Sequence, residues 1–218
     1  MLFDALGTLL TLDPPAPRLR AAVEHHTGID VGLQAAERAF GAEIDFYLAN
    51  HMRGGDRAGL QALRDDCAEV VAHALADVRL SPAVVREPMI ESITFSALPD
   101  AAPALRALRD RGIGRVVVSN WDVSLSEGLR GAGLDGLIDA AVSSAEVGVA
   151  KPAPEPLLAG LGLAGVGPGE ALYVGDSPDT DVAAARAAGV TPVLVVRNGE
   201  LPEDVTAVRS LADVASLF

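Results

Sequence analysis

The chain has 218 residues, half of them apolar, and a formal net charge of −13, so it can bury one sizeable core and carry a smaller accessory unit. This charge argues against nucleic acid as a partner, and a small anion could bind only in a pocket with its own positive charge. No apolar run approaches the roughly 18 residues that span a membrane, and the lone Cys67 excludes an intramolecular disulfide.

The first part of the chain reads as a short strand followed by helices. Leu2-Phe3 is predicted as a strand, and Gly7-Thr8 as a loop. The proline-rich segment 13–17 is a stiff connector. From about residue 18 to residue 89 apolar residues recur at helical spacing, which predicts three or four helices and no strand.

After Pro99 the pattern alternates between helices and strands. Strands are predicted at 115–118, 137–142, 171–174 and 192–196, and helices at 101–111, 123–129, 154–161, 179–188 and 211–217. This alternation predicts an α/β fold, in which a parallel sheet is covered by helices on both faces. Ligands in such sheets bind outside the carboxyl ends of the strands.

Polar residues follow three of these strands. Asp4, Ser119 and Asp176 each lie at or just after a strand, and Lys151 lies in a loop before a predicted helix. One edge of the sheet would therefore collect two carboxylates, a hydroxyl and an ammonium. A carboxylate can attack a substrate, a cation can bridge two carboxylates, and the ammonium and hydroxyl can stabilise a transferred anion.

Lys151 is also unusual in composition, since the other 16 of the 17 basic residues are arginines. Coding bias explains the arginines but not the exception. Lysine provides a compact point charge rather than a planar fork. Two interpretations stay open: the site requires that point charge, or one surface lysine survived by chance.

Four segments resemble the motifs of the haloacid dehalogenase-like hydrolase superfamily, in order. The segment 3–9 (FDALGTL) resembles the first motif, Val118-Ser119-Asn120 the second, Lys151-Pro152 with 154–156 the third, and 175–181 (GDSPDTD) the fourth. The resemblance implies a Rossmann-like core at 1–12 and 94–218 and a helical cap at 13–93. It also implies a hydrolase that acts on a small anionic substrate.

The resemblance implies a magnesium site. Asp4 would be both the nucleophile and a Mg²⁺ ligand, and the backbone carbonyl of Leu6 would face the same ion. Asp176 would be a further ligand, and Asp181 either a ligand or an acid just behind the ligands.

The remaining motif residues would handle the anion. Ser119 would hydrogen-bond the transferred group, and Lys151 would neutralise charge and orient Asp4. Thr8 would steady the first loop and, with Asn120, contribute to substrate binding. The lone cysteine and the absence of a basic leader predict a cytoplasmic protein, which we expect to be a monomer or a homodimer.

Leu6 departs from the pattern, because the phosphatases of this superfamily carry an acid two residues after the nucleophile. Leucine can neither protonate a leaving group nor activate water. Three interpretations stay open: a phosphatase that needs no acid at this position, a metal-free dehalogenase of the 2-haloacid type, and a ligand-binding protein with little turnover. The acids of the fourth motif, Asp176 and Asp181, favour the phosphatase.

The first strand is short for a central strand, because only three residues precede Asp4. Either the natural start lies upstream, or this strand is unusually short.

Overall fold

The computed structural model describes residues 1–214 and 217, and they form two compact units. One unit comprises Met1–Thr11 with Phe95–Phe218, and the other comprises Leu12–Thr94. The predicted cap, 13–93, differs from the second unit by one residue at each end. Within the described residues, no helix is both long and apolar enough to cross a membrane.

The core unit is built on a six-stranded parallel sheet, which confirms the predicted fold class. Its strands, in the order β5-β4-β1-β6-β7-β8, are Ala140–Ser143, Val116–Ser119, Leu2–Phe3, Leu172–Gly175, Thr191–Val195 and Thr206–Val208. β1 has only two residues but pairs on both sides, with Phe3 opposite Val117 and Val174. The sequence pattern did not predict β8.

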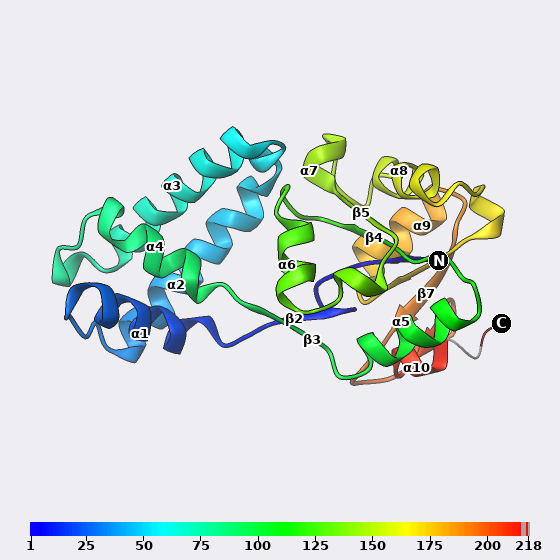
Figure 1. Cartoon of the computed structure of the whole chain (residues 1–218), viewed down its shortest axis with the longest axis horizontal. Coiled ribbons are helices and arrows are strands. Elements are labelled where there is room, and N and C mark those ends of the chain that lie inside the picture. The colour runs from blue at the N-terminus through cyan, green and yellow to red at the C-terminus, as the bar shows by residue number, and fades with distance from the viewer. Residues whose placement is uncertain (215–216, 218) are drawn as a thin grey trace. The chain divides into compact units, whose positions relative to one another are not determined.

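Helices cover both faces of the sheet because successive side chains of a strand point to opposite sides. Phe3, Val117 and Val174 pack against α5 (Ala101–Asp110), α6 (Leu125–Gly131) and α10 (Leu211–Val214). Leu2, Val116 and Val118 pack against α8 (Glu155–Ala164) and α9 (Ala183–Ala187). In Figure 1, α5 and α10 accordingly lie on the opposite side of the strands from α8.

Several predicted boundaries differ from the observed ones. The predicted helix 179–188 begins as a single π-helical turn, η5 (Pro178–Val182), before α9, and the predicted strand 137–142 begins only at Ala140, after a 3-10 turn, η3 (Asp135–Leu137). Residues 215 and 216 of the predicted helix 211–217 lie outside the described residues. Two further short helices complete the unit: α7 (Ser144–Val147) and η4 (Pro168–Glu170).

Two short strands that were not predicted join the chain segments leading into and out of the second unit. β2 (Leu10–Leu12) pairs with β3 (Phe95–Ala97) in a separate two-stranded sheet. The backbone N–H of Leu98 donates to the carbonyl of Leu9, so the pairing continues toward the first loop of the core.

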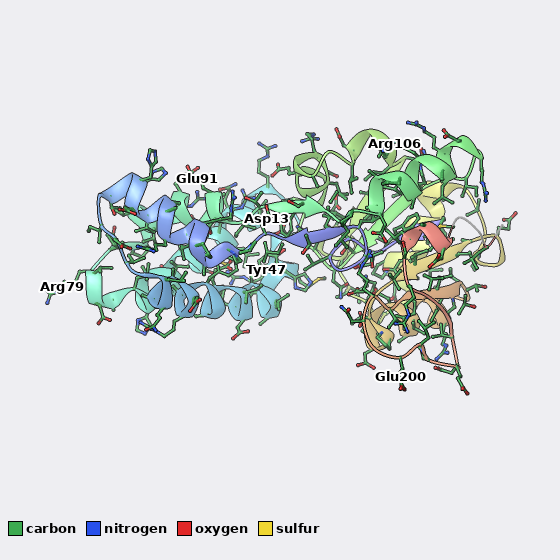
Figure 2. The ribbon with its side chains drawn as sticks, turned by 90° about the horizontal axis from the view of Figure 1, so that it is seen from below. Asp13, Tyr47, Arg79, Glu91, Arg106 and Glu200 are labelled. Atoms are coloured by element: carbon green, nitrogen blue, oxygen red, sulfur yellow. The ribbon has the colours of Figure 1, made fainter. Side chains whose placement is uncertain are left out.

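The second unit consists of helices, as the sequence pattern predicts. They are α1 (Pro15–Thr27), α2 (Leu33–Asn50), η1 (His51–Gly54), α3 (Arg57–Ala74), η2 (Ala76–Val78) and α4 (Pro82–Ser92) (Figure 1). The Asp56 side chain caps α3 by accepting from the N–H of Gly59. The apolar stripes of the helices meet in a core that includes Leu19, Phe40 and Leu63. Charged side chains such as Arg79 and Glu91 project outward around it (Figure 2).

Candidate active site

The four residues expected to form the site come from adjacent parts of the core. Ser119 is the last residue of β4, Asp4 directly follows β1, and Asp176 directly follows β6. These are three neighbouring strands at the centre of the sheet, so their carboxyl ends share one edge. Lys151 reaches the same place from the turn that precedes α8, where its ammonium bonds Asp4.

The ammonium of Lys151 is buried, with its side chain 2% exposed, and has three acceptors. It donates to Oδ1 of Asp4 at 2.6 Å, to Oδ1 of Asp181 at 2.6 Å and to the hydroxyl of Tyr173 at 2.7 Å. Burial alone would lower the pKa of Lys151, but its attraction to Asp4 and Asp181 raises that pKa above the ordinary value. Lys151 is therefore a fixed positive charge with all three donors used.

Asp4 is held through one of its two carboxylate oxygens. Oδ1 accepts from Lys151 and, at 2.9 Å, from the Ser119 hydroxyl. Among the described residues both of these hydrogen bonds fall on Oδ1, which leaves Oδ2 for a substrate or a metal ion. Burial raises the pKa of Asp4, while Lys151 acts in the opposite direction. A bound cation would further favour the carboxylate form that a nucleophile requires.

Asp181 is engaged at both oxygens. Oδ1 accepts from Lys151 and lies 3.1 Å from the Tyr173 hydroxyl, and Oδ2 accepts from the backbone N–H groups of Asp176 and Ser177 at 3.0 Å each. A carboxylate has about four lone-pair sites, so little capacity remains for a metal. Asp181 thus anchors Lys151 and the turn that carries Asp176, and its role as a metal ligand or as an acid behind the ligands stays a prediction.

Tyr173 is a site residue that the sequence pattern did not reveal. It lies in β6 and is 1% exposed. Its hydroxyl accepts from Lys151 and donates to the carbonyl of Val118 at 3.0 Å. In the sequence it belongs to an apolar strand, where an aromatic residue indicates packing. Its hydrogen bond to Lys151 becomes evident only when the strand and the Lys151 turn are brought together.

Thr8 and Asn120, which are predicted to contribute to substrate binding, make contacts within the protein, and their binding of substrate stays a prediction. Thr8 is completely buried, and its backbone carbonyl accepts from Arg197 at 3.0 Å, which steadies the first loop. Its hydroxyl has no hydrogen-bond partner among the described residues. The amide of Asn120 accepts from the backbone N–H of Lys151 and donates to the Lys151 carbonyl. Asn120 therefore fixes the Lys151 turn, since both ends of its amide are committed to that backbone.

Asp4, Asp176 and Asp181 form a group that could hold a cation, because one carboxylate oxygen of each lies within 4.8 Å of the others. Three carboxylates against one ammonium leave two negative charges. Asp176 shows the repulsion: partial burial of its carboxylate, together with Asp4 and Asp181, raises its pKa to about 6. A divalent ion would remove this repulsion, and carboxylate oxygens are ligands that Mg²⁺ prefers.

Gly7 makes room for this arrangement. It has a positive φ of 85°, and a Cβ built on it would lie 2.1 Å from Oδ2 of Asp176. The first loop can approach the carboxylate so closely only because this residue has no side chain. The residues present therefore fit a metal held by Asp4 and Asp176, and the contribution of the Leu6 carbonyl stays a prediction.

A groove of about 670 Å³ opens beside Asp176, within the core unit. Gly7 and Asp176 line one part of it, and the loop after β7, with Arg197, Asn198 and Glu200, lines another. Glu200 is labelled on that loop in Figure 2. The carboxylate of Asp176 is thus accessible from solvent, whereas Lys151 and Asp181 are buried.

Comparison with known proteins settles the family. A profile of the haloacid dehalogenase-like hydrolases matches residues 1–189 of the chain. The chain belongs to this family. It is also 30% identical, over 181 residues, to the mouse haloacid dehalogenase-like hydrolase domain-containing protein 3, a match that covers 79% of this chain and 72% of the mouse protein.

Solved structures of haloacid dehalogenase-like proteins share the fold over nearly the whole chain. A phosphatase of the family from Thermococcus onnurineus is 25% identical with a TM-score of 0.64, and covers 99% of this chain and 95% of its own. A 2-haloacid dehalogenase from Pseudomonas syringae is 22% identical with a TM-score of 0.68, and covers 99% of this chain and 96% of its own. The chain thus resembles both kinds of hydrolase in fold.

In this haloacid dehalogenase-like hydrolase, different side chains of the site have different chemical roles. Asp4 offers an oxygen that no hydrogen bond occupies among the described residues, and Lys151 with Ser119 fixes the other oxygen. Leu6, which is 41% exposed, offers no proton. The arrangement can therefore attack an electrophile and hold negative charge, but the proton for a leaving group has to come from elsewhere.

Proposed function

We propose that this chain is a magnesium-dependent phosphatase that acts on a small phosphorylated metabolite through Asp4. The observation that carries the proposal is the pair Asp4 and Asp176, whose carboxylates approach each other while Lys151 is committed to Asp4 and Asp181. A hydrolase without a metal has no need of an exposed carboxylate beside its nucleophile. The likeness to a phosphatase of the family supports the same function.

The residues of the chain would act in two steps. The Asp4 carboxylate attacks phosphorus, the bond from phosphorus to the leaving oxygen breaks, and an aspartyl phosphate forms. Water then attacks the same phosphorus and releases inorganic phosphate, which restores the Asp4 carboxylate. Lys151 holds its charge beside Asp4 throughout and opposes the build-up of negative charge. A magnesium ion, when bound by Asp4 and Asp176, would supply electrostatic stabilisation of the phosphoryl oxygens.

Leu6 limits the substrates that such a site can use efficiently. A general acid typically contributes about 10²–10⁴ in rate, and leucine contributes nothing of this kind. Phosphates whose leaving groups depart as stable anions, such as aryl or acyl phosphates, need the acid least. We therefore infer a preference for phosphates with good leaving groups over alkyl phosphates.

A second function, a 2-haloacid dehalogenase, is favoured by the same residue, because dehalogenases of the family also lack the acid. In that reaction Asp4 would displace a halide from carbon, and water would attack the ester at the Asp4 carboxyl carbon. No proton is required by a departing halide, so Leu6 would be harmless there. The exposed Asp176 argues against it, because a reaction without a metal has no use for a second carboxylate beside Asp4.

The experiment compares an aryl phosphate, an alkyl phosphate and a 2-haloacid as substrates, each with magnesium and with a chelator. The proposal predicts turnover of the aryl phosphate that magnesium supports and the chelator abolishes, and no turnover in the Asp4→Asn variant. Turnover of the haloacid that survives chelation would replace the phosphatase with the dehalogenase. Binding of a phosphate analogue with no turnover of any substrate would show a ligand-binding protein.

A further inference from the structure

Arg197 joins the loop after β7 to the loop that carries the nucleophile. Its Nη2 donates to the carbonyl of Thr8 at 3.0 Å, and its Nη1 donates to Oδ2 of Asp100 at 2.8 Å. In the sequence Arg197 lies 189 positions from Thr8 and 97 positions from Asp100, but all three residues belong to one unit of the structure. A guanidinium can make both bonds at once because its donors form a rigid planar fork.

Asp100 is itself fixed, so it provides a firm support for Arg197. Its Oδ2 also accepts from the hydroxyl of Ser210 and from the backbone N–H of Leu211, both at 2.9 Å. Burial alone would raise the pKa of Asp100, but the hydrogen bonds from Arg197, Leu211 and Ser210 lower it. The carboxylate therefore ties the start of α10 and the loop after β7 to the residue that precedes α5.

The Thr8 carbonyl is well placed to transmit this support to the site. Thr8 follows Gly7, whose α-carbon faces the Asp176 carboxylate so closely that a Cβ there would lie 2.1 Å from Oδ2. The first loop is also short, because four residues separate Asp4 from Leu9, whose N–H donates to the Ala5 carbonyl. A shift of the Thr8 peptide would therefore move Gly7 against Asp176.

We propose that Arg197 is a positioning residue that holds the first loop, and through Gly7 the spacing of Asp4 and Asp176, in the geometry that binds the metal ion. Asp100 orients Arg197 in turn. The inference rests on the proposed function, because it assigns Arg197 to the metal-dependent step. It is separable from that function, since loop order can be measured without metal or substrate.

The test uses the full chain with Arg197→Gln, and the matched control is Arg209→Gln. Arg209 is exposed and donates to the carbonyls of Val196 and Gly199, so it braces the same loop after β7 without a bond to Thr8. Hydrogen exchange of the amides of residues 4–10 is measured without metal. Magnesium affinity is measured by calorimetry, and turnover of an aryl phosphate is measured over a range of magnesium concentrations.

We expect faster exchange in residues 4–10 and magnesium affinity about 10- to 100-fold weaker in Arg197→Gln, the range seen when a residue supporting a metal ligand is lost. Turnover of this variant should recover largely at high magnesium, because the catalytic groups are intact. The control should match the wild type in both exchange and affinity. Arg197→Lys should recover only part of the affinity, because one ammonium does not reproduce the fork.

Two outcomes would overturn the inference: unchanged exchange and affinity in Arg197→Gln, or equal losses in Arg209→Gln. If Arg197→Gln does not fold, Asp100→Asn keeps the shape of the support and weakens its ion pair with Arg197, and the same shifts at reduced size are expected. Wild-type protein that turns over no phosphate refutes the proposed function instead. In that case the exchange measurement alone still decides whether Arg197 orders the first loop.

Discussion

Glu43 lies in the helical unit, and we expect it to make the free energy of unfolding of this unit depend on pH. This residue of α2 is 3% exposed and shares a hydrogen bond with Cys67 of α3, which is 2% exposed. Burial raises the pKa of Glu43 from 4.5 to about 7. Burial, followed by the proximity of Glu43, raises the pKa of Cys67 as well, so the thiol stays neutral.

The sign of the effect follows from these values. In the unfolded chain Glu43 ionises near pH 4.5, whereas in the folded unit it keeps its proton up to about pH 7. The contribution of Glu43 to the free energy of unfolding is therefore fully present below pH 4.5 and is lost as the pH rises toward 7. One pKa unit corresponds to about 1.4 kcal/mol, so the shift corresponds to a loss of about 3 kcal/mol at most.

The perturbation is Glu43→Gln, which keeps the shape and removes the ionisation. Its free energy of unfolding, from denaturant titrations that follow the helical unit, should rise relative to wild type by up to about 3 kcal/mol between pH 5 and pH 8. Glu37→Gln, on the exposed side of the same helix, serves as the control. A constant difference between Glu43→Gln and wild type across this range would refute the assignment.

Three further substitutions test the site. Leu6→Asp restores an acid two residues after the nucleophile, so turnover of an alkyl phosphate should rise by up to about 10²–10⁴, and no gain would show that proton transfer is not limiting. Gly7→Ala should weaken magnesium affinity in calorimetry by about 10- to 100-fold, because its Cβ meets the metal-binding carboxylate. Gly112→Ala is the control, since it shares a positive φ but has open space, and equal losses would indicate backbone strain alone. Tyr173→Phe should lower the free energy of unfolding by about 1–3 kcal/mol in denaturant titrations, because the buried Lys151 loses an acceptor, and an unchanged value would contradict that bond.

The sequence was most informative where strands and polar residues alternate. The positions of Asp4, Ser119 and Asp176 at strand ends are enough to predict that they share an edge, because parallel strands point the same way. Lys151 stands out in the sequence as the one lysine among 17 basic residues, and in the structure its ammonium is buried and bonds three acceptors.

Other features depend on contacts between distant segments and were therefore not predictable. Tyr173 resembles a core residue until its hydroxyl meets Lys151, and the pairing of β2 with β3 joins residues more than eighty positions apart. The two oxygens of Asp181 face different partners, which residue type alone does not specify. Arg197 is one of 16 arginines, and only the fold distinguishes it from the others.

The most direct test of the central claim follows heavy oxygen from isotopically labelled water during a single turnover, with enzyme in excess over an aryl phosphate and with magnesium present. Attack of water on phosphorus predicts that the label appears in the released phosphate, that Asp4 stays unlabelled, and that a chelator prevents the reaction. Label found in the Asp4 carboxylate, or turnover that persists with the chelator, would contradict a magnesium-dependent phosphatase.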